Sequence, residues 1–255
     1  MGTTHDGTIE AVNRSMKVIE TIKELEGAGV TDLANELGWA KSTVHTHLKT
    51  LVENEFLIRD DGQYDLSHRF MDCGEYVKDR HPIYSAVEPK LEELADETGK
   101  RVQFITQEHG YAIYVRIAEG EHSVSTGAKL GRRRMMLHAT AAGKSILSHL
   151  PRDEADAILD DQGLYQFTEN TITDRQELYE EFAEIRERGY AVNREEHIEG
   201  LRAIAAPVTT PDGDVLGAVS VADAAHRMKG EWFEEELPEL LLGVVNEIEL
   251  DVAYS

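Results

Sequence analysis

The N-terminal part of the chain carries the apolar spacing of three short helices followed by a hairpin. Apolar residues recur every three or four positions, as on one face of a helix, in residues 10–25, 31–37 and 41–54. Gly38 ends the second helix, and the third begins at once. Residues 56–59 and 63–66 then flank an Asp-Asp-Gly turn, which is typical of a β-hairpin. This order predicts a winged helix-turn-helix domain over residues 8–70.

The rest of the chain predicts a helical linker over residues 71–99 and an α+β domain over residues 100–255. The linker is interrupted at His81-Pro82 and carries one apolar stripe. Alternation predicts strands at 101–108, 111–117, 123–130, 190–193, 202–209 and 215–223, and a last helix is predicted over 233–252. Because the strands occur in hairpins and the helices do not alternate strictly with them, the sheet is predicted to be mostly antiparallel.

Two further helices are predicted from the residues at their starts. The capping-box spacing at Thr173-Asp174-Arg175-Gln176 predicts a helix that ends at Gly189. Another helix begins near Thr140, where Ala141 and Ala142 are small. Small residues at a helix N-terminus leave backbone N–H groups accessible to an anion.

Composition limits the class of protein. The chain has 255 residues, a net charge of −23, and no uninterrupted apolar run of about 18 residues such as a membrane span requires. The polar start of the chain and a single cysteine, Cys73, are typical of a cytoplasmic protein without disulfides. A basic cluster consists of Lys129, Arg132, Arg133 and Arg134. We expect it to balance nearby acidic residues on the surface; the alternatives are a contact with DNA, with another subunit or with an anionic effector.

The charge distribution favours DNA binding by the third helix. An acidic protein repels phosphate at long range, unless molar salt reduces the Debye length to about 3 Å. However, no acidic residue lies between Gly38 and Val52, although 49 of the 255 residues are acidic. This segment offers lysine, serine, threonine and histidine side chains, which bond phosphates and base edges. The whole composition favours a halophilic source.

The sequence lacks the motifs of common enzymes. Gly143-Lys144-Ser145 resembles the end of a phosphate loop, but such a loop needs a glycine where His138 stands. His45 and His47 are two positions apart and point to different faces of a helix, so no zinc site is expected. Glu195-Glu196 is weak support for acid–base catalysis in so acidic a chain. We therefore expect no enzymatic activity, no metal and no cofactor.

The N-terminal motifs resemble the DNA-binding domain of the IclR family of transcriptional regulators. The resemblance rests on residues 33–38, on Lys-Ser-Thr-Val-His at 41–45, and on the turn at 60–64. It implies that the third helix contacts DNA through Lys41, Ser42, Thr43, His45, Thr46 and His47, and that Lys49, Arg59 and Tyr64 make backbone or wing contacts. The family often has arginine where this chain has His47.

The C-terminal motifs are similar to the effector-binding domain of the same family, which has a GAF-like fold. They are the segments 137–145, 188–191, 200–208 and 217–221, together with Glu195-Glu196. The resemblance implies a pocket between the sheet and the helix after Thr140, with Ala141, Ala142, Asn193, Glu196, Ala203, Ser220 and Ala222 as candidates. Relatives often have cysteine at the position of Ala203 and a hydroxyl residue at that of Ala222, so two polar groups are replaced by methyl groups here.

The sequence therefore predicts a regulator that binds double-stranded operator DNA and responds to a small-molecule effector, in particular a carboxylate or sugar-derived acid. At least a homodimer is expected, because one winged helix reads too few base pairs. The resemblance to the IclR family implies a dimer of dimers as the alternative assembly. The resemblance together with the acidic composition indicates a halophilic archaeon as the source. The alternative is a metabolite-binding GAF-like protein, or an enzyme, whose N-terminal helices serve only to dimerise.

Overall fold

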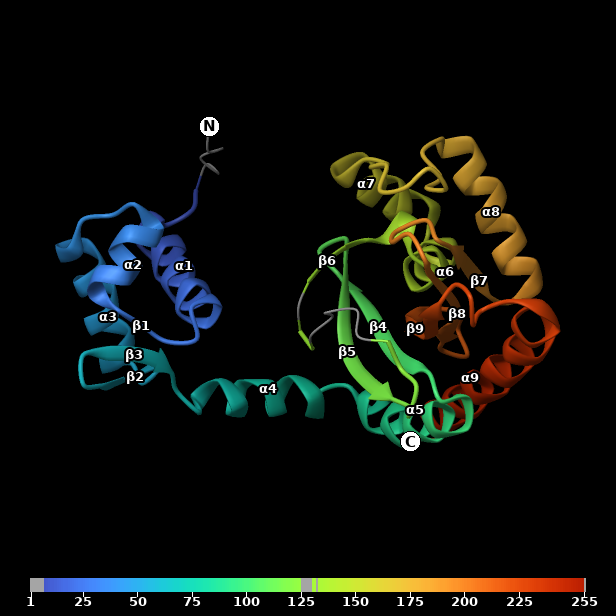
Figure 1. Cartoon of the computed structure of the whole chain (residues 1–255), viewed down its shortest axis with the longest axis horizontal. Helices are drawn as coiled ribbons and strands as arrows, with labels where there is room; N and C mark the ends of the chain where they lie inside the picture. Colours follow the sequence, from blue (N-terminus) through green and yellow to red (C-terminus); the bar gives the residue numbers. More distant parts are fainter. Residues whose placement is uncertain (1–6, 125–129, 132, 255) are drawn as a thin grey trace. The chain divides into compact units, whose positions relative to one another are not determined.

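The computed structural model describes residues 7–124, 130–131 and 133–254, and the chain divides into two units, 1–80 and 81–255. The described part of the first unit (blue to teal in Figure 1) has four helices and a small sheet. Its elements are α1 Glu10–Glu24, β1 Ala28–Gly29, α2 Val30–Leu37, α3 Lys41–Glu53, β2 Leu57–Asp60, β3 Gln63–Leu66 and α4 Arg69–Asp79. The predicted winged helix-turn-helix is thus confirmed, with β1 added to the hairpin in the order β1-β3-β2.

The core of the first unit follows from the helical apolar stripes. Val18 and Ile22 of α1, Leu33 of α2, and Val44 and Leu48 of α3 are all fully buried. Between α2 and α3 the chain turns sharply through a glycine in the left-handed conformation at position 38 (φ 67°), where other residues are strained. This turn sets the direction of α3 against the other two helices.

The boundary between the units lies inside the segment expected to be a linker. No residue of α4 is buried, and α4 belongs to the first unit. The next helix, α5 Pro82–Thr98, belongs to the second unit and buries Val87, Leu91 and Leu94 in its core. Pro82 starts α5, as expected for a residue without a backbone N–H at the first helical position. The predicted linker therefore consists of an exposed helix and a core helix.

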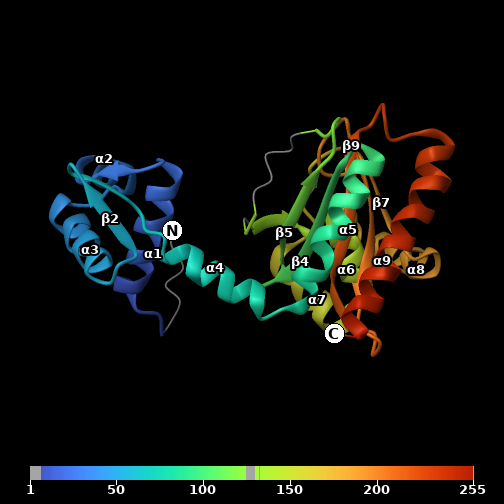
Figure 2. The ribbon, with the colours of Figure 1, turned by 90° about the horizontal axis from the view of Figure 1, so that it is seen from below.

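The second unit is a six-stranded antiparallel sheet with helices on both faces (Figures 1 and 2). The strand order is β6-β5-β4-β9-β8-β7. The strands are β4 Arg101–Glu108, β5 Tyr111–Glu119, β6 Arg133–Met136, β7 Ala191–Arg194, β8 Leu201–Thr209 and β9 Val215–Ala224. The further helices are η1 Leu137–Ala139, α6 Ala141–His149, α7 Arg152–Gln162, α8 Arg175–Arg188, η2 Trp232–Glu236 and α9 Leu237–Ala253. One core lies under α5 and α9, and another under α6, α7 and α8.

Several local predictions differ from the structure. The cap of α8 is Asp174, which accepts a hydrogen bond from the Glu177 N–H, so the capping box assigned to Thr173 was wrong by one residue. Of the predicted strand 123–130, residues 125–129 lie outside the described residues, and the described ones form no strand. The basic cluster at 129–134 also falls largely outside the description. Helix α7 was not predicted at all.

Candidate DNA interface and effector pocket

The exposed face of α3 presents most of the predicted DNA contacts. Lys41, Ser42, His45, Thr46 and Lys49 are exposed, and Thr43 is half-buried. The helix has no acidic residue in its first turn, and its N-cap residue makes no side-chain cap bond. Backbone N–H groups at such a helix start, together with the helix dipole, favour a phosphate. This face is therefore chemically suited to a nucleic-acid backbone.

Two of the predicted contacts point toward the interior of the unit. The Nδ1 atom of His47 lies 2.9 Å from the Ser15 hydroxyl of α1, and its ring lies 6.1 Å from that of Trp39. Tyr64 is 4% exposed, and Arg59 lies over its ring at 5.6 Å. His47 and Tyr64 thus hold α3 and the wing in place, whereas Arg59 is exposed on the wing.

The start of α6 packs closely against the segment that precedes it in the sequence. The Thr140 hydroxyl accepts a hydrogen bond from the Gly143 N–H at 3.0 Å. A Cβ atom at Gly143 would collide with the carbonyl oxygen of Leu137, which explains the glycine of the Gly-Lys-Ser motif. Ala141 and Ala142 are buried in the core between this helix and the sheet. The Gly-Lys-Ser motif therefore serves the packing of α6 against the preceding segment. This agrees with the sequence, which has His138 where a phosphate loop needs a glycine.

Three of the predicted pocket residues form one row across the sheet. Asn193 of β7 pairs with Ala203 of β8, and Ala203 pairs with Ala222 of β9. Ser220 lies two residues before Ala222, so it shares that face. Asn193 has a structural task as well, because its amide donates to the Ala139 carbonyl at 2.6 Å and accepts from the Glu196 N–H at 3.1 Å. The structure thus gathers this row on the face that α6 covers.

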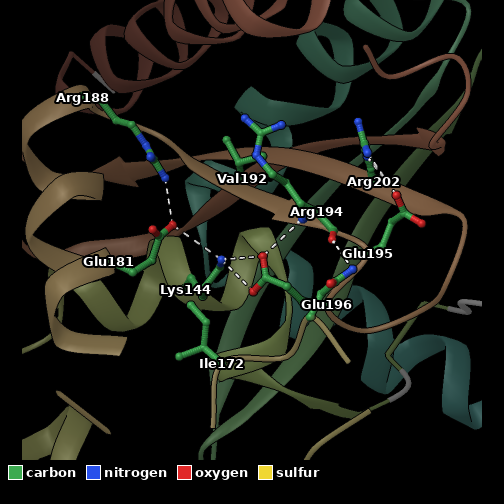
Figure 3. Close-up of a pocket in the computed structure, with 10 residues that line it drawn as sticks. Lys144, Ile172, Glu181, Arg188, Val192, Arg194, Glu195, Glu196 and Arg202 are labelled. Carbon is green, nitrogen blue, oxygen red and sulfur yellow. Dashed lines mark hydrogen bonds and ion pairs between the residues drawn. The ribbon is translucent and has the colours of Figure 1, made fainter. Parts of the chain in front are cut away.

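Glu196 has a partner that sequence reasoning missed. The Lys144 side chain of α6 is 1% exposed and points to the Glu196 carboxylate, and it also lies 3.5 Å from Glu181 of α8 (Figure 3). Arg188 binds Glu181 from the other side at 2.8 Å. Burial raises the pKa of the Glu196 carboxyl, although the positive charge of Lys144 acts in the opposite direction. Nothing in the local sequence indicates this pairing, because it joins segments far apart in the chain.

A cavity of about 420 Å³ lies beside this network, at the edge strand β7 (Figure 3). Its lining consists of Lys144, Asn170, Ile172, Glu181, Arg188, Val192, Arg194, Glu195, Glu196 and Arg202. Of the predicted pocket residues only Glu196 belongs to it. Its cations are paired with carboxylates, as in Arg194 with Glu234 and Arg202 with Glu195. The positive charges that line this cavity are therefore neutralised by carboxylates of the protein itself.

Two family models match the chain. The model of the bacterial transcriptional regulator IclR C-terminal domain covers residues 75–250, and that of the IclR helix-turn-helix domain covers residues 11–61. The chain belongs to the IclR family of transcriptional regulators. The resemblance seen in the sequence motifs is thereby confirmed.

Relatives of known name match this IclR-family chain over most of its length. It is 33% identical over 245 residues to the probable HTH-type transcriptional regulator ArcR of Halobacterium salinarum. The matched residues cover 95% of this chain and 93% of that protein. It is 28% identical over 228 residues to the transcriptional repressor IclR of Escherichia coli, covering 87% and 82% of the two chains. The crystal structure of Thermotoga maritima IclR matches with a TM-score of 0.82 and 28% identity, over 97% of this chain and 100% of that one.

A homologue has been crystallised with a small molecule. The IclR homolog from Microbacterium hydrocarbonoxydans, complexed with 4-hydroxybenzoate, has a TM-score of 0.81 and 20% identity, over 96% of this chain and 100% of that one. At this identity the likeness shows the common fold. The family places this protein among DNA-binding transcriptional regulators with a C-terminal effector-binding domain. Among the described residues, no helix is long and apolar enough to cross a bilayer.

Proposed function

We propose that this regulator reads its operator with the exposed face of α3 and responds to a small carboxylate or sugar-derived acid held between α6 and the sheet. The contacts to DNA come from Lys41, Ser42, Thr43, His45 and Thr46, with Lys49 and Arg59 on phosphates. His47 and Tyr64 position α3 and the wing through the packing described above. The protein acts in the cytoplasm, without catalysis.

The observation that carries the DNA interface is the absence of acidic residues from α3 until its last residue, Glu53. In a chain with a net charge of −23, a helix whose exposed positions hold lysine, histidine and hydroxyl side chains is the exception. The acidic remainder of the surface repels a phosphate backbone, whereas the exposed face of α3 attracts it. The acidity of the remaining surface and the relative in Halobacterium salinarum support a halophilic archaeal source.

The effector site is supported by the row of small side chains beneath α6. Ala203 and Ala222 place only methyl groups between Asn193 and β4, and the buried Ala141 and Ala142 keep the start of α6 close to the sheet. A carboxylate bound there interacts favourably with the N-terminal end of the α6 dipole. Its binding alters DNA affinity only as far as it favours one conformation of the assembly over another.

The oligomer is a homodimer or a dimer of dimers, and α4 is the element that favours self-association. Met71, Tyr76 and Val77 of α4 are 65%, 64% and 47% exposed, although they are apolar. A helix with no buried residue and a partly apolar surface is stabilised by packing against a second helix. Two winged helices on one dimer also match a palindromic operator.

The test is a selection of genomic fragments with the full chain in molar KCl, followed by titration of the enriched fragment. We expect a palindromic fragment to be enriched. Lys41→Ala weakens binding to it and lowers the slope of log affinity against log salt by about one. Lys23→Ala is the matched control, since Lys23 is an exposed lysine at the end of α1. Equal affinity of both variants contradicts the placement of the interface, and a folded dimer that enriches no fragment favours the metabolite-binding alternative.

A further inference from the structure

The cavity beside the edge strand β7 is lined mostly by charged side chains. Of its ten lining residues, seven are charged: four carry a positive charge and three a negative one. They come from α6, α8, β7, β8 and the turn after β7, and Figure 3 shows them around one network of ion pairs. The volume of about 420 Å³ lies in the range of small-molecule pockets, about 300–1,000 Å³.

The charges around this cavity cancel. Each lining cation lies in an ion pair with a carboxylate. With Glu234, which pairs with Arg194 but does not line the cavity, four positive charges face four negative charges. The summed charge is therefore zero, so a simple anion or a simple cation is not attracted over a distance. A ligand that carries both charges interacts with groups of both signs.

Glu181 of α8 offers a free acceptor on the wall of the cavity. Its side chain is 17% exposed, and its Oε1 atom lies 2.8 Å from Arg188 and 3.5 Å from Lys144. Within the part of the chain that the structure describes, the other oxygen, Oε2, takes part in no hydrogen bond or ion pair. It is not one of the fully buried atoms either, so a ligand can reach it. A carboxylate oxygen of this kind accepts a hydrogen bond from an ammonium group.

Arg194 of β7 offers a free donor to the same cavity. Its two terminal nitrogens donate to Glu234 at 3.0 and 2.8 Å, whereas its Nε atom has no acceptor among the described residues. Both side chains are 50% exposed, and such an exposed pair contributes little to stability, so a ligand carboxylate can take the place of Glu234. The hydrogen bonds to Glu234 raise the pKa of Arg194, and the negative charge of Glu181 also raises it. The guanidinium and the Glu181 carboxylate are therefore near each other without being bonded to each other.

The wall of the cavity also has an apolar part. It consists of Ile172 and Val192, of which Val192 is 9% exposed and Ile172 is half-buried. Contact with these side chains removes apolar surface of a ligand from water. The cavity thus combines a free acceptor, a free donor and an apolar surface.

We propose that this cavity binds a free apolar α-amino acid in its zwitterionic form, as a second ligand besides the effector beneath α6. The ammonium group donates to the Oε2 atom of Glu181, the carboxylate accepts from Arg194, and the side chain lies against Ile172 and Val192. Because Glu181 also contacts Lys144, the ligand adds to the ion pairs that hold α6. The inference goes beyond the proposed function, and it does not depend on which molecule binds beneath α6.

The first experiment measures ligand binding to the full chain in molar KCl by calorimetry. The probes are valine, leucine, methionine and phenylalanine, each with its amide, which keeps only the positive charge, and with the acid that lacks the amino group, which keeps only the negative charge. We expect at least one amino acid to bind at least about tenfold more tightly than both of its analogues, because hydrogen bonds between charged groups are the strong ones. Binding by none of the amino acids, or equal binding of an amino acid and its analogues, overturns the proposal.

The second experiment assigns the two charged contacts. Glu181→Gln is expected to remove the preference for the amino acid over the acid without an amino group. Glu184→Gln is its matched control, because Glu184 also pairs with Arg188 from α8, is 67% exposed and does not line the cavity. An equal loss of preference in the two variants, or none in Glu181→Gln, overturns the contact.

The carboxylate contact has its own variant. Arg194→Met is expected to remove the preference for the amino acid over its amide. Arg152→Met is the control, since Arg152 pairs with Asp156 on the exposed side of α7 and does not line the cavity. If Glu181→Gln does not fold, as circular dichroism shows, Arg194→Met still decides, because its side chain is half exposed. An unchanged preference in the folded Arg194→Met variant overturns the proposal.

A further variant separates this cavity from the row beneath α6. Ala222→Leu fills the centre of that row and is expected to leave the affinity for the amino acid unchanged, because Ala222 does not line the cavity. Loss of amino-acid binding in a folded Ala222→Leu variant, together with full binding in Arg194→Met, would place the amino acid beneath α6. That result overturns the second site and leaves the proposed effector site standing.

Discussion

The Nζ atom of Lys144 lies 2.8 Å from each carboxylate oxygen of Glu196, a residue 52 positions further along the chain. The lysine comes from the first turns of α6, and the glutamate follows β7. Their side chains are 1% and 7% exposed. The ion pair therefore fastens α6 to the loop beyond β7, and it keeps the start of α6 above the row of small residues that we assign to the effector.

Removing one partner of this buried pair is expected to destabilise the effector domain strongly. Lys144→Met leaves the Glu196 carboxylate without its buried partner, which costs about 3–5 kcal/mol in comparable pairs. Urea unfolding of the full chain measures the loss. The double variant with Glu196→Leu is expected to cost less than the sum of the two single variants, because no buried charge remains.

The control for this prediction is an exposed ion pair in the same domain. Arg194 and Glu234 are 2.8 Å apart, and their side chains are both 50% exposed. Arg194→Met is expected to cost less than about 1 kcal/mol. If Lys144→Met costs no more than this control, the pair does not fasten α6.

The stability of the effector domain is expected to fall as the pH drops below the ordinary histidine pKa of 6.5. Burial lowers the pKa of His138, against the hydrogen bond to the Tyr165 carbonyl, and it also lowers the pKa of His197. Both histidines therefore take up a proton at a lower pH in the folded protein than in the unfolded chain, which binds protons already below 6.5. The contribution of the neutral histidines is fully present above that pH and is lost as the pH falls toward their lowered pKa.

Unfolding free energies at pH 7.5 and 5.5 test this dependence. His138→Gln retains a donor for the Tyr165 carbonyl and is expected to reduce the loss of stability between the two pH values. His226→Gln, at an exposed histidine, serves as the control. A loss of the same size in His138→Gln and in the native protein argues against His138 as a source of the effect.

The DNA-binding domain could be predicted almost residue by residue because its signals are local. The apolar spacing, the glycine at position 38 and the Asp-Asp-Gly turn each act over a few residues, and the predicted third helix, 41–54, ends within one residue of α3. What the local pattern did not show was the direction of individual side chains on the boundary of the core. His47 lies between the exposed and the buried face, and its contact with Ser15 depends on where α1 packs.

The effector domain was predicted correctly as a class of fold, but the neighbours of its candidate pocket residues were not predicted. Hairpins and turns indicated an antiparallel sheet, whereas the strand order, in which β4 lies beside β9, depends on contacts between distant segments. This neighbourhood places Arg101 opposite Ala222 and Gln103 opposite Ser220. The Lys144 to Glu196 pair was missed for the same reason. Helix α7 carries acidic residues over much of its length, and only Ala155, Ile158 and Leu159 of it are buried, so its apolar signal is weak.

Substitutions at neighbouring histidines of α3 are expected to separate base recognition from packing. His45 is exposed, so His45→Ala is expected to change the preferred operator sequence with little change in the stability of the domain. His47→Ala removes the contact with Ser15 and is expected to lower the melting temperature while the preferred sequence stays the same. Repeating the genomic selection with both variants gives the answer. A changed sequence preference in His47→Ala would mean that this ring reaches the DNA.

Helix α4 is expected to control self-association. Its apolar residues, Met71, Tyr76 and Val77, are exposed, and a charge placed among them opposes close packing of two copies. Val77→Glu is therefore expected to shift the assembly toward monomer, measured by sedimentation equilibrium in molar KCl, where long-range charge repulsion is screened. The control, Gln176→Glu, adds the same charge at an exposed position of α8. Because a palindromic operator binds two winged helices at once, Val77→Glu should also bind it more weakly while the affinity for a single half-site is retained. A Val77→Glu variant as fully assembled as Gln176→Glu would place the contact between copies outside α4.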